Sequence, residues 1–87
     1  MHEHSLLQDL LRKVDTIARE EGSARVVSVQ VRLGALAHIS PDHLREHFER
    51  ATQGTVAQGA TLLVETDADI HAPHAQDILL QSVEVAT

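Results

Sequence analysis

The apolar residues of this chain first follow a helical spacing and then a strand spacing, and this switch limits the folds open to it. From Leu6 to Ala18 they recur every three or four positions, as on one face of a helix. Ser5 opens a capping-box pattern ahead of this run, and Gly22 follows it. We therefore predict a helix over about residues 5–21.

A valine-rich segment, Arg25 to Leu33, follows this helix. Its residues alternate between apolar and polar, which is typical of a strand with one buried face. We predict that the buried residues are Val27, Val29, Val31 and Leu33.

The second half of the chain starts with another helix. Ser40-Pro41 is a strong helix start, since serine can cap the helix and proline suits its first turn. Gly54 closes this helix. Its predicted inward stripe consists of Leu44, Phe48 and Ala51.

Two further strands are predicted over residues 60–66 and 78–85, joined by a polar connection over residues 67–77. The fold class is then α+β, with the order α-β-α-β-β and two helices packed on one face of a three-stranded mixed sheet. We expect the first two strands to be parallel and the last two to form an antiparallel hairpin. The predicted inward-facing residues are Leu62 and Val64 in one strand and Leu79, Val83 and Val85 in the other.

Composition limits the class of protein. The 87 residues predict one small domain, 1–87, and Phe48 is the only Phe, Tyr or Trp, so the core must be aliphatic. A net charge of −6 argues against nucleic acid as a partner. The chain has no cysteine, no membrane-spanning apolar run and no signal-peptide pattern, which predicts a soluble cytoplasmic protein without contact to a membrane.

Histidine is unusually frequent, with seven residues, and His2 follows the N-terminal methionine directly. The Met1 amine, the His2 amide nitrogen and the His2 imidazole could chelate a metal, with Glu3 or His4 supplying a fourth donor. Nitrogen donors in a square-planar array favour Ni(II) or Cu(II) over Zn(II). The alternative is that His2 is an incidental histidine at a frayed terminus.

Several segments together resemble the HypA (HybF-type) hydrogenase maturation factors, which are nickel metallochaperones. The resemblance begins at Met1-His2-Glu3 with Ser5-Leu6. It continues through residues 29–34 and 39–44 and resumes at Gly54-Thr55 and residues 59–62, ending at residues 82–85. It covers nearly the whole chain in order.

The resemblance implies an α+β domain that binds Ni(II) and takes part in inserting it into [NiFe]-hydrogenase. It places the metal site on Met1, His2 and Glu3. It also implies two partners, a HypB-type GTPase and the hydrogenase large subunit, and in some organisms the urease maturation proteins.

The chain departs from the family pattern between the last two predicted strands. Family members carry a zinc-binding insertion there with two Cys-x-x-Cys pairs, whereas residues 67–77 form a short turn without cysteine. We therefore expect no zinc site of the family type.

The remaining histidines leave alternatives open. His71 and His74 could form a substitute metal site or a plain exposed turn, and His43 and His47, one helical turn apart, could hold a metal or simply face solvent. Three further residues could complete the nickel site: His4, His38 and Asp42.

Two functions of different class fit these observations. The first is a nickel carrier working by ligand exchange, with no catalytic residue and no enzymatic activity. The second is a metal-free module that docks on the GTPase or on the hydrogenase large subunit. The sequence shows no Ser-His-Asp order, phosphate loop or carboxylate pair that would indicate an enzyme.

Overall fold

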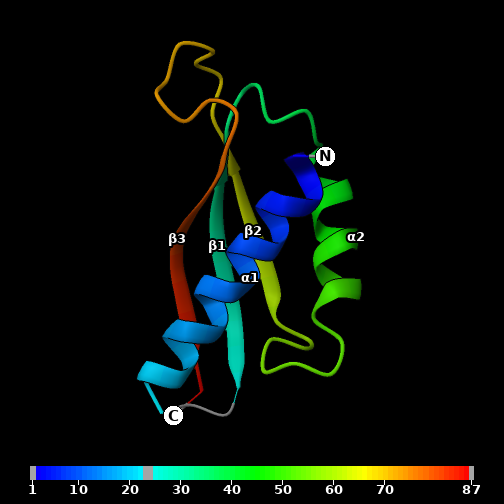
Figure 1. Ribbon diagram of the computed structural model, residues 1–87, viewed down its shortest axis with the longest axis vertical. Helices are drawn as coiled ribbons and strands as arrows, with labels where there is room; N and C mark the ends of the chain where they lie inside the picture. The colour runs from blue at the N-terminus through cyan, green and yellow to red at the C-terminus, as the bar shows by residue number, and fades with distance from the viewer. Residues whose placement is uncertain (1, 23–24, 87) are drawn as a thin grey trace.

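A computed structural model describes the chain over residues 2–22 and 25–86. The side chains of residues 2–4 lie outside this description. Within the described residues the elements follow the predicted order (Figure 1). They are helix α1 (His2–Glu20), strand β1 (Val26–Leu33), helix α2 (Pro41–Ala51), strand β2 (Thr61–Thr66) and strand β3 (Ile78–Val85).

Helix α1 begins at His2, ahead of the predicted start, so the prediction that Ser5 caps the helix is wrong. Ser5 is exposed and lies inside the first turns. A capping pattern is a local signal. It does not mark the start of a helix when the residues before it can also adopt helical conformation. Glutamate, the residue type at position 3, is favoured in a first turn because the helix N-terminus carries partial positive charge.

Helix α2 matches its prediction closely. The Ser40 hydroxyl accepts a hydrogen bond from the His43 backbone N–H at 3.1 Å, and Pro41 occupies the first turn. Leu44 and Phe48 are buried on the inner side, as predicted, but the third residue of the predicted stripe, Ala51, is exposed because the helix ends there. The helix ends at Ala51, and the Thr52 hydroxyl donates back to the Phe48 carbonyl.

The sheet places β1 in the centre, in the order β2-β1-β3 over the described strands. β1 pairs in parallel with β2, as predicted, and antiparallel with β3. The predicted hairpin between β2 and β3 is therefore wrong. Consecutive strands pair only about two-thirds of the time, and here the 67–77 connection crosses over the end of β1 instead of turning back.

Irregular pairing between β1 and β3 breaks the simple alternation of buried and exposed residues along these strands. The β1–β3 register slips between Val26 and Ser28, and Val26 is fully buried while Val27 is 37% exposed. An extra residue in a ladder reverses which residues face inward. A second slip lies between Gln30 and Val31 of β1, where the pairing skips Gln81 of β3. As a result, the β3 residues that pack on the core are Ile78, Leu80, Val83 and Val85, and the predicted Leu79 is not among them.

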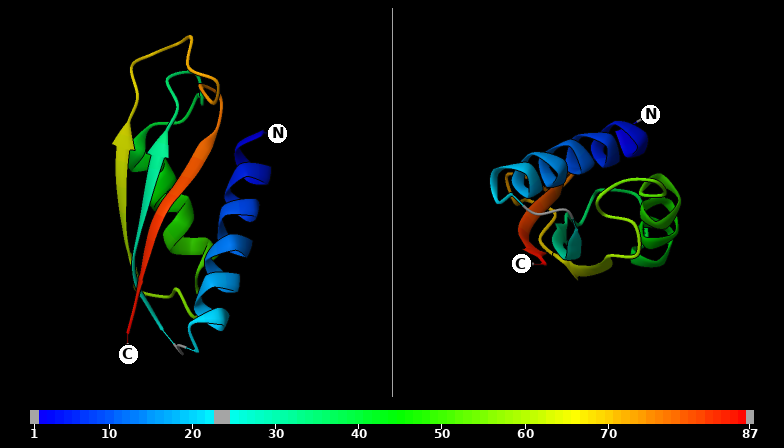
Figure 2. Two further views of the ribbon diagram at one scale, coloured as in Figure 1. Left: turned by 90° about the vertical axis from the view of Figure 1, so that its left-hand side faces the viewer. Right: turned by 90° about the horizontal axis from the view of Figure 1, so that it is seen from below.

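Both described helices cover the same face of the sheet, as Figure 2 shows, and the core between the layers is aliphatic around Phe48. The helices run in the same direction, so their N-terminal ends lie at the same end of the molecule as the 67–77 loop (Figure 1). Neither described helix combines the length and apolar character needed to cross a bilayer. The fully buried aliphatic side chains include Leu10, Val14, Val26, Val29, Val31 and Leu44.

At that end, the loop after β1 packs against the 67–77 loop at Gly34. The Gly34 N–H donates to the Asp77 carbonyl at 3.0 Å, and the Leu36 N–H donates to the Ala75 carbonyl at 2.7 Å. A Cβ on Gly34 would fall on the Ala75 carbonyl group and would lie 2.6 Å from the His74 carbonyl oxygen. Glycine is therefore required here by space and not by backbone conformation.

An ion pair reinforces the same junction. Arg32 at the end of β1 pairs with Asp67, Nε to Oδ2 3.4 Å, and with Glu65. The Asp69 backbone N–H also donates to Asp67 Oδ1 at 3.0 Å. This backbone hydrogen bond, aided by the Arg32 guanidinium, lowers the pKa of the Asp67 carboxyl below its usual value.

We expect Gly34→Ala to destabilise the fold by about 1–3 kcal/mol, the usual range for overpacking against atoms that cannot move aside. The free energy of unfolding from urea denaturation measures this cost. Gly22→Ala is the matched control, because φ is +66° there but a Cβ would meet no atom within 4 Å. A smaller loss for Gly34→Ala than for Gly22→Ala would show that the two loops are not in close contact.

We expect Asp67→Asn to destabilise the protein at neutral pH. Because the folded-state pKa of Asp67 is lowered, its stabilising contribution is present above the ordinary carboxyl pKa of about 3.9 and disappears as the pH falls through the folded value. The difference in free energy of unfolding between parent and variant should therefore shrink in acid. Asp15→Asn, which removes a surface pair with Arg19 on α1, serves as the control. A difference that stays constant with pH would argue against the Arg32–Asp67 interaction.

Candidate metal-binding site

The segments that carry the described histidines converge toward the end of the molecule where both helices begin. This end also carries the loop after β1 and the 67–77 loop (Figure 1). The topology therefore brings together segments that are distant in sequence. All histidines with described side chains come from these segments: His38, His43, His47, His71 and His74.

The predicted nickel ligands lie at the start of α1. Met1 lies outside the described residues, and so do the side chains of His2, Glu3 and His4. The backbone of His2 and Glu3 is helical. The first four N–H groups of a helix have no acceptor within it, so intrahelical bonding leaves both amide nitrogens unused.

His38 and Asp42 flank the start of α2. His38 is exposed and has a φ of 58°, a left-handed conformation that is uncommon for a residue other than glycine. The Asp42 side chain is 97% exposed and forms an ion pair with Arg45 at 3.2 Å. Neither residue belongs to a described group of metal ligands.

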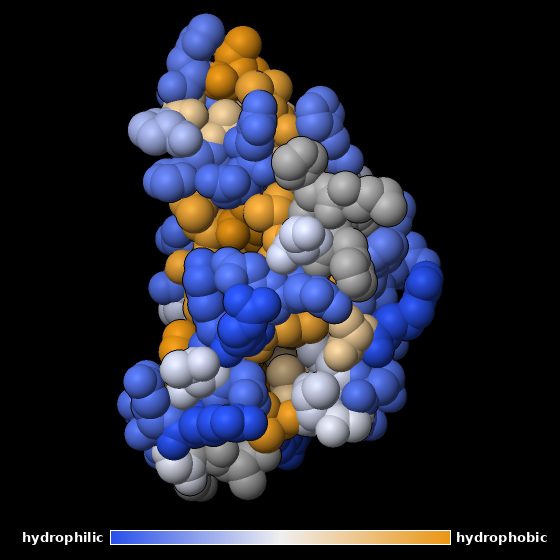
Figure 3. Space-filling view, in the orientation of Figure 1, coloured by the Kyte–Doolittle hydropathy of each residue, from blue (hydrophilic) through white to orange (hydrophobic). Residues whose placement is uncertain are grey.

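A groove between α1 and β3 was not anticipated from the sequence. Its floor is apolar, with Ile17, Leu79 and Leu80, and Arg12 and Lys13 stand on its rim. Figure 3 shows patches of apolar surface among the hydrophilic residues of the face that carries α1. No sequence signal marks such a groove, because it forms between α1 and β3, two elements that are distant in sequence.

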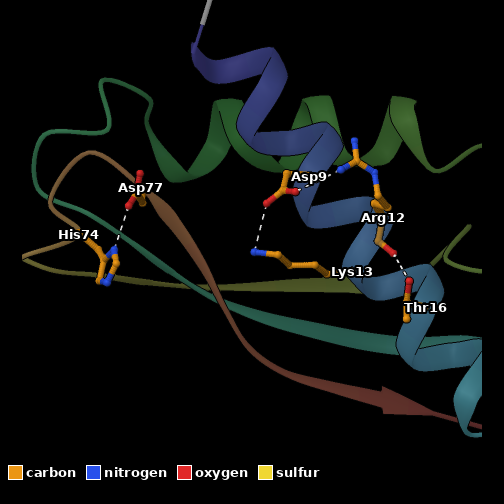
Figure 4. A network of polar contacts seen from close by, with 6 residues as sticks. All are labelled: Asp9, Arg12, Lys13, Thr16, His74 and Asp77. Atoms are coloured by element: carbon orange, nitrogen blue, oxygen red, sulfur yellow. Dashed lines mark hydrogen bonds and ion pairs between the residues drawn. The ribbon is translucent and has the colours of Figure 1, made fainter.

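The 67–77 loop contains turns closed by its own side chains. Asp69 Oδ1 accepts a hydrogen bond from the His71 N–H at 2.9 Å, and His74 Nδ1 lies 3.0 Å from Asp77 Oδ2. Figure 4 shows the His74–Asp77 pair within this loop, apart from the surface pairs of Asp9 with Arg12 and Lys13 on α1. The structure thus uses His74 to hold the turn.

His43 and His47 lie one turn apart on α2, and their rings touch. The two Nε2 atoms are 2.8 Å apart, and the ring centroids are 4.5 Å apart. The sequence spacing predicted a shared helix face but not this contact. Among the side chains that the structure describes, no group of three or more His, Cys, Asp or Glu residues could hold a metal ion.

The sequence is similar to a set of bacterial and archaeal proteins. A family described as "Hydrogenase/urease nickel incorporation, metallochaperone, hypA" matches residues 1–72. The chain is 40% identical to hydrogenase maturation factor HypA of Methylocella silvestris over 65 residues, covering 75% of this chain and 58% of that protein. It is 44% identical over 62 residues to the HypA of Rhizobium leguminosarum bv. viciae, covering 71% of this chain and 55% of the relative. For the HypA of Archaeoglobus fulgidus the identity is 41% over 71 residues, covering 80% and 64%.

The fold is similar to a solved structure as well. The solution structure of the nickel metallochaperone HypA from Helicobacter pylori superposes with a TM-score of 0.76 at 14% identity, covering 98% of this chain and 97% of that one. In sequence, the chain spans little more than half of the Methylocella relative, 58% of its length. The match over residues 1–72 and the shared arrangement of helices and strands lead to one conclusion: the chain belongs to the HypA family of nickel-incorporation metallochaperones.

Proposed function

We propose that this protein carries Ni(II) as cargo for the maturation of [NiFe]-hydrogenase and binds it at its N-terminus. The observation that carries the proposal is that the family match begins at residue 1 and so includes Met1-His2-Glu3. The Met1 amine, the His2 amide nitrogen and the His2 imidazole would chelate the ion, and Glu3 would supply a fourth donor. Such a nitrogen-rich planar set suits Ni(II).

The position of this site supports transfer of the ion. The start of α1 leaves the amides of His2 and Glu3 without helical acceptors, so a metal can displace their protons without breaking intrahelical bonds. A helix N-terminus disfavours a bare cation, and deprotonated amides offset that cost by adding negative charge to the site. Delivery is then ligand exchange with an acceptor protein, and no residue is assigned a catalytic role.

The partners form part of the same proposal. A HypB-type GTPase and the [NiFe]-hydrogenase large subunit would exchange nickel with this protein, and urease maturation proteins would be a further destination. We propose that the whole chain, residues 1–87, acts as one nickel-binding domain in the cytoplasm. With no cysteine in the chain, residues 67–77 would replace the family's zinc module as a short loop.

A second candidate function is a metal-free docking module. The groove between α1 and β3 supports it, because an apolar floor with a rim of Arg12 and Lys13 suits a partner segment that is apolar and acidic. Nickel binding separates the two functions, since only the carrier requires it.

We expect the untagged protein to bind one Ni(II) at the N-terminus as a square-planar, diamagnetic complex. His2→Ala should abolish this complex, and so should extra residues placed ahead of Met1, because each removes one nitrogen of the chelate. Isothermal titration and the visible d–d spectrum measure both effects. His71→Ala is the matched control and should retain the complex. If the extended chain and His2→Ala bind nickel as the parent does, the docking module becomes the better candidate.

We expect the affinity for Ni(II) to increase as the pH rises through the range above about 6.5, the usual imidazole pKa. Binding requires a neutral imidazole and releases amide protons, so the complex is weakened in acid. Competition with a chromophoric chelator at a series of pH values measures the trend, and His2→Ala should flatten it. An affinity independent of pH would rule out coordination by imidazole and amide nitrogen.

A further inference from the structure

The histidine pair on α2 has a geometry that a metal ion could use directly. His43 and His47 are separated by one helical turn, with His43 exposed to solvent and His47 half-buried. Their Nε2 atoms lie 2.8 Å apart, with the ring planes inclined at 64°. Both Nε2 atoms therefore approach one point in space.

That separation is close to the one that coordination needs. At a nitrogen–metal distance of about 2.0–2.1 Å, two imidazole ligands at the right angle of a square-planar or octahedral ion would be about 2.9 Å apart. The observed 2.8 Å lies close to that separation. A metal held by both Nε2 atoms requires that neither nitrogen carries a proton, so binding depends on neutral imidazoles.

The helix holds the two rings in place before any metal arrives. Ser40 caps the first turn by accepting from the His43 N–H, and Pro41 limits the backbone there. Leu44 and Phe48, each the residue after one of the histidines and so on the adjacent inward face, are 0% and 2% exposed and anchor the helix to the sheet. The ring positions are thus set by a packed element and not by a loop.

The other candidate pair has no comparable arrangement. His74 directs Nδ1 to the Asp77 carboxylate at 3.0 Å, and the backbone N–H of His71 bonds to Asp69. These contacts hold the turns of the 67–77 loop. The α2 pair is therefore the better candidate for metal binding among the described histidines.

We propose that His43 and His47 form a second site for a divalent transition metal, separate from the N-terminal chelate. Two imidazole nitrogens supply half or less of a coordination shell, and no described group of three or more ligand side chains includes them. The site is therefore open to exchangeable ligands and binds its ion loosely. Imidazole suits Ni(II), Cu(II) and Zn(II).

The location of this second site suggests a role in supplying metal to the N-terminal chelate or to an acceptor protein. α2 begins at the same end of the molecule as α1, so the pair belongs to the end that would carry the nickel chelate (Figure 1). A loosely held ion there would be available to the stronger N-terminal ligands or to an acceptor protein. This use rests on the proposed function, whereas the metal site itself does not.

The test titrates nickel chloride into ¹⁵N-labelled His2→Ala protein, in which the N-terminal chelate is disabled. Ni(II) bound by two imidazoles and water is paramagnetic and broadens nearby amide signals, so signals of residues 40–48 should broaden first. His43→Gln or His47→Gln alone should weaken binding at least about tenfold, since loss of even an outer partner costs 10–100-fold in metal affinity. The double variant should remove the broadening. Neither residue is part of the buried core, and the amide spectrum without metal verifies that the variants fold.

The matched control is His71→Gln with His74→Gln, which removes two exposed histidines from the loop and should leave the broadening of α2 unchanged. Broadening that persists in the His43/His47 double variant, or that centres on residues 67–77, would overturn the proposal. The parent protein distinguishes this outcome from failure of the proposed function. The N-terminal complex is diamagnetic and coloured, so its absence would count against the nickel carrier while broadening of α2 would still establish the second site.

Discussion

The burial of β1 is the constraint on which the rest of the structure depends. Val29 and Val31 are fully buried, and β1 bonds to a parallel neighbour on one side and an antiparallel neighbour on the other. The parallel pairing requires a crossover, which α2 provides above the sheet. The antiparallel pairing requires the chain to pass from β2 across the end of β1 to reach β3. The loop after β1 and the 67–77 loop must therefore meet, and Gly34 allows them to do so.

This arrangement concentrates the chemistry of the molecule at one end. Because α1 and α2 run in the same direction over the same face of the sheet, both present their N-terminal turns there (Figure 2). Helix N-termini repel a cation, so a metal at this end needs ligands that contribute negative charge or strong nitrogen donors. The proposed N-terminal chelate and the α2 histidine pair would both provide such donors. Weakly held, exposed metal would suit the proposed role of nickel carrier.

The elements of this fold followed from local patterns. The periodicity of apolar residues predicted each helix and strand to within a few residues, and Ser40-Pro41 marked the start of α2, because these signals act over one or two turns. The α+β class and the packing of both described helices on one face were also predicted correctly (Figure 2). Ser5 misled the prediction of α1 because a possible cap does not exclude a longer helix. The resemblance of short segments identified the family, which the match over residues 1–72 confirmed.

The tertiary structure decided what depends on competition between distant segments. The hairpin prediction failed because β3 gains more by pairing with the central, fully buried β1 than with the exposed edge strand next to it in sequence. The slips in the β1–β3 ladder exchanged Val26 for Val27 and Leu80 for Leu79 on the buried face, and no periodicity reveals such slips. The sequence by itself determined that His43 and His47 share a face, since this follows from helical geometry. The 2.8 Å between their nitrogens was decided by the packed helix and by the orientation of two side chains upon it.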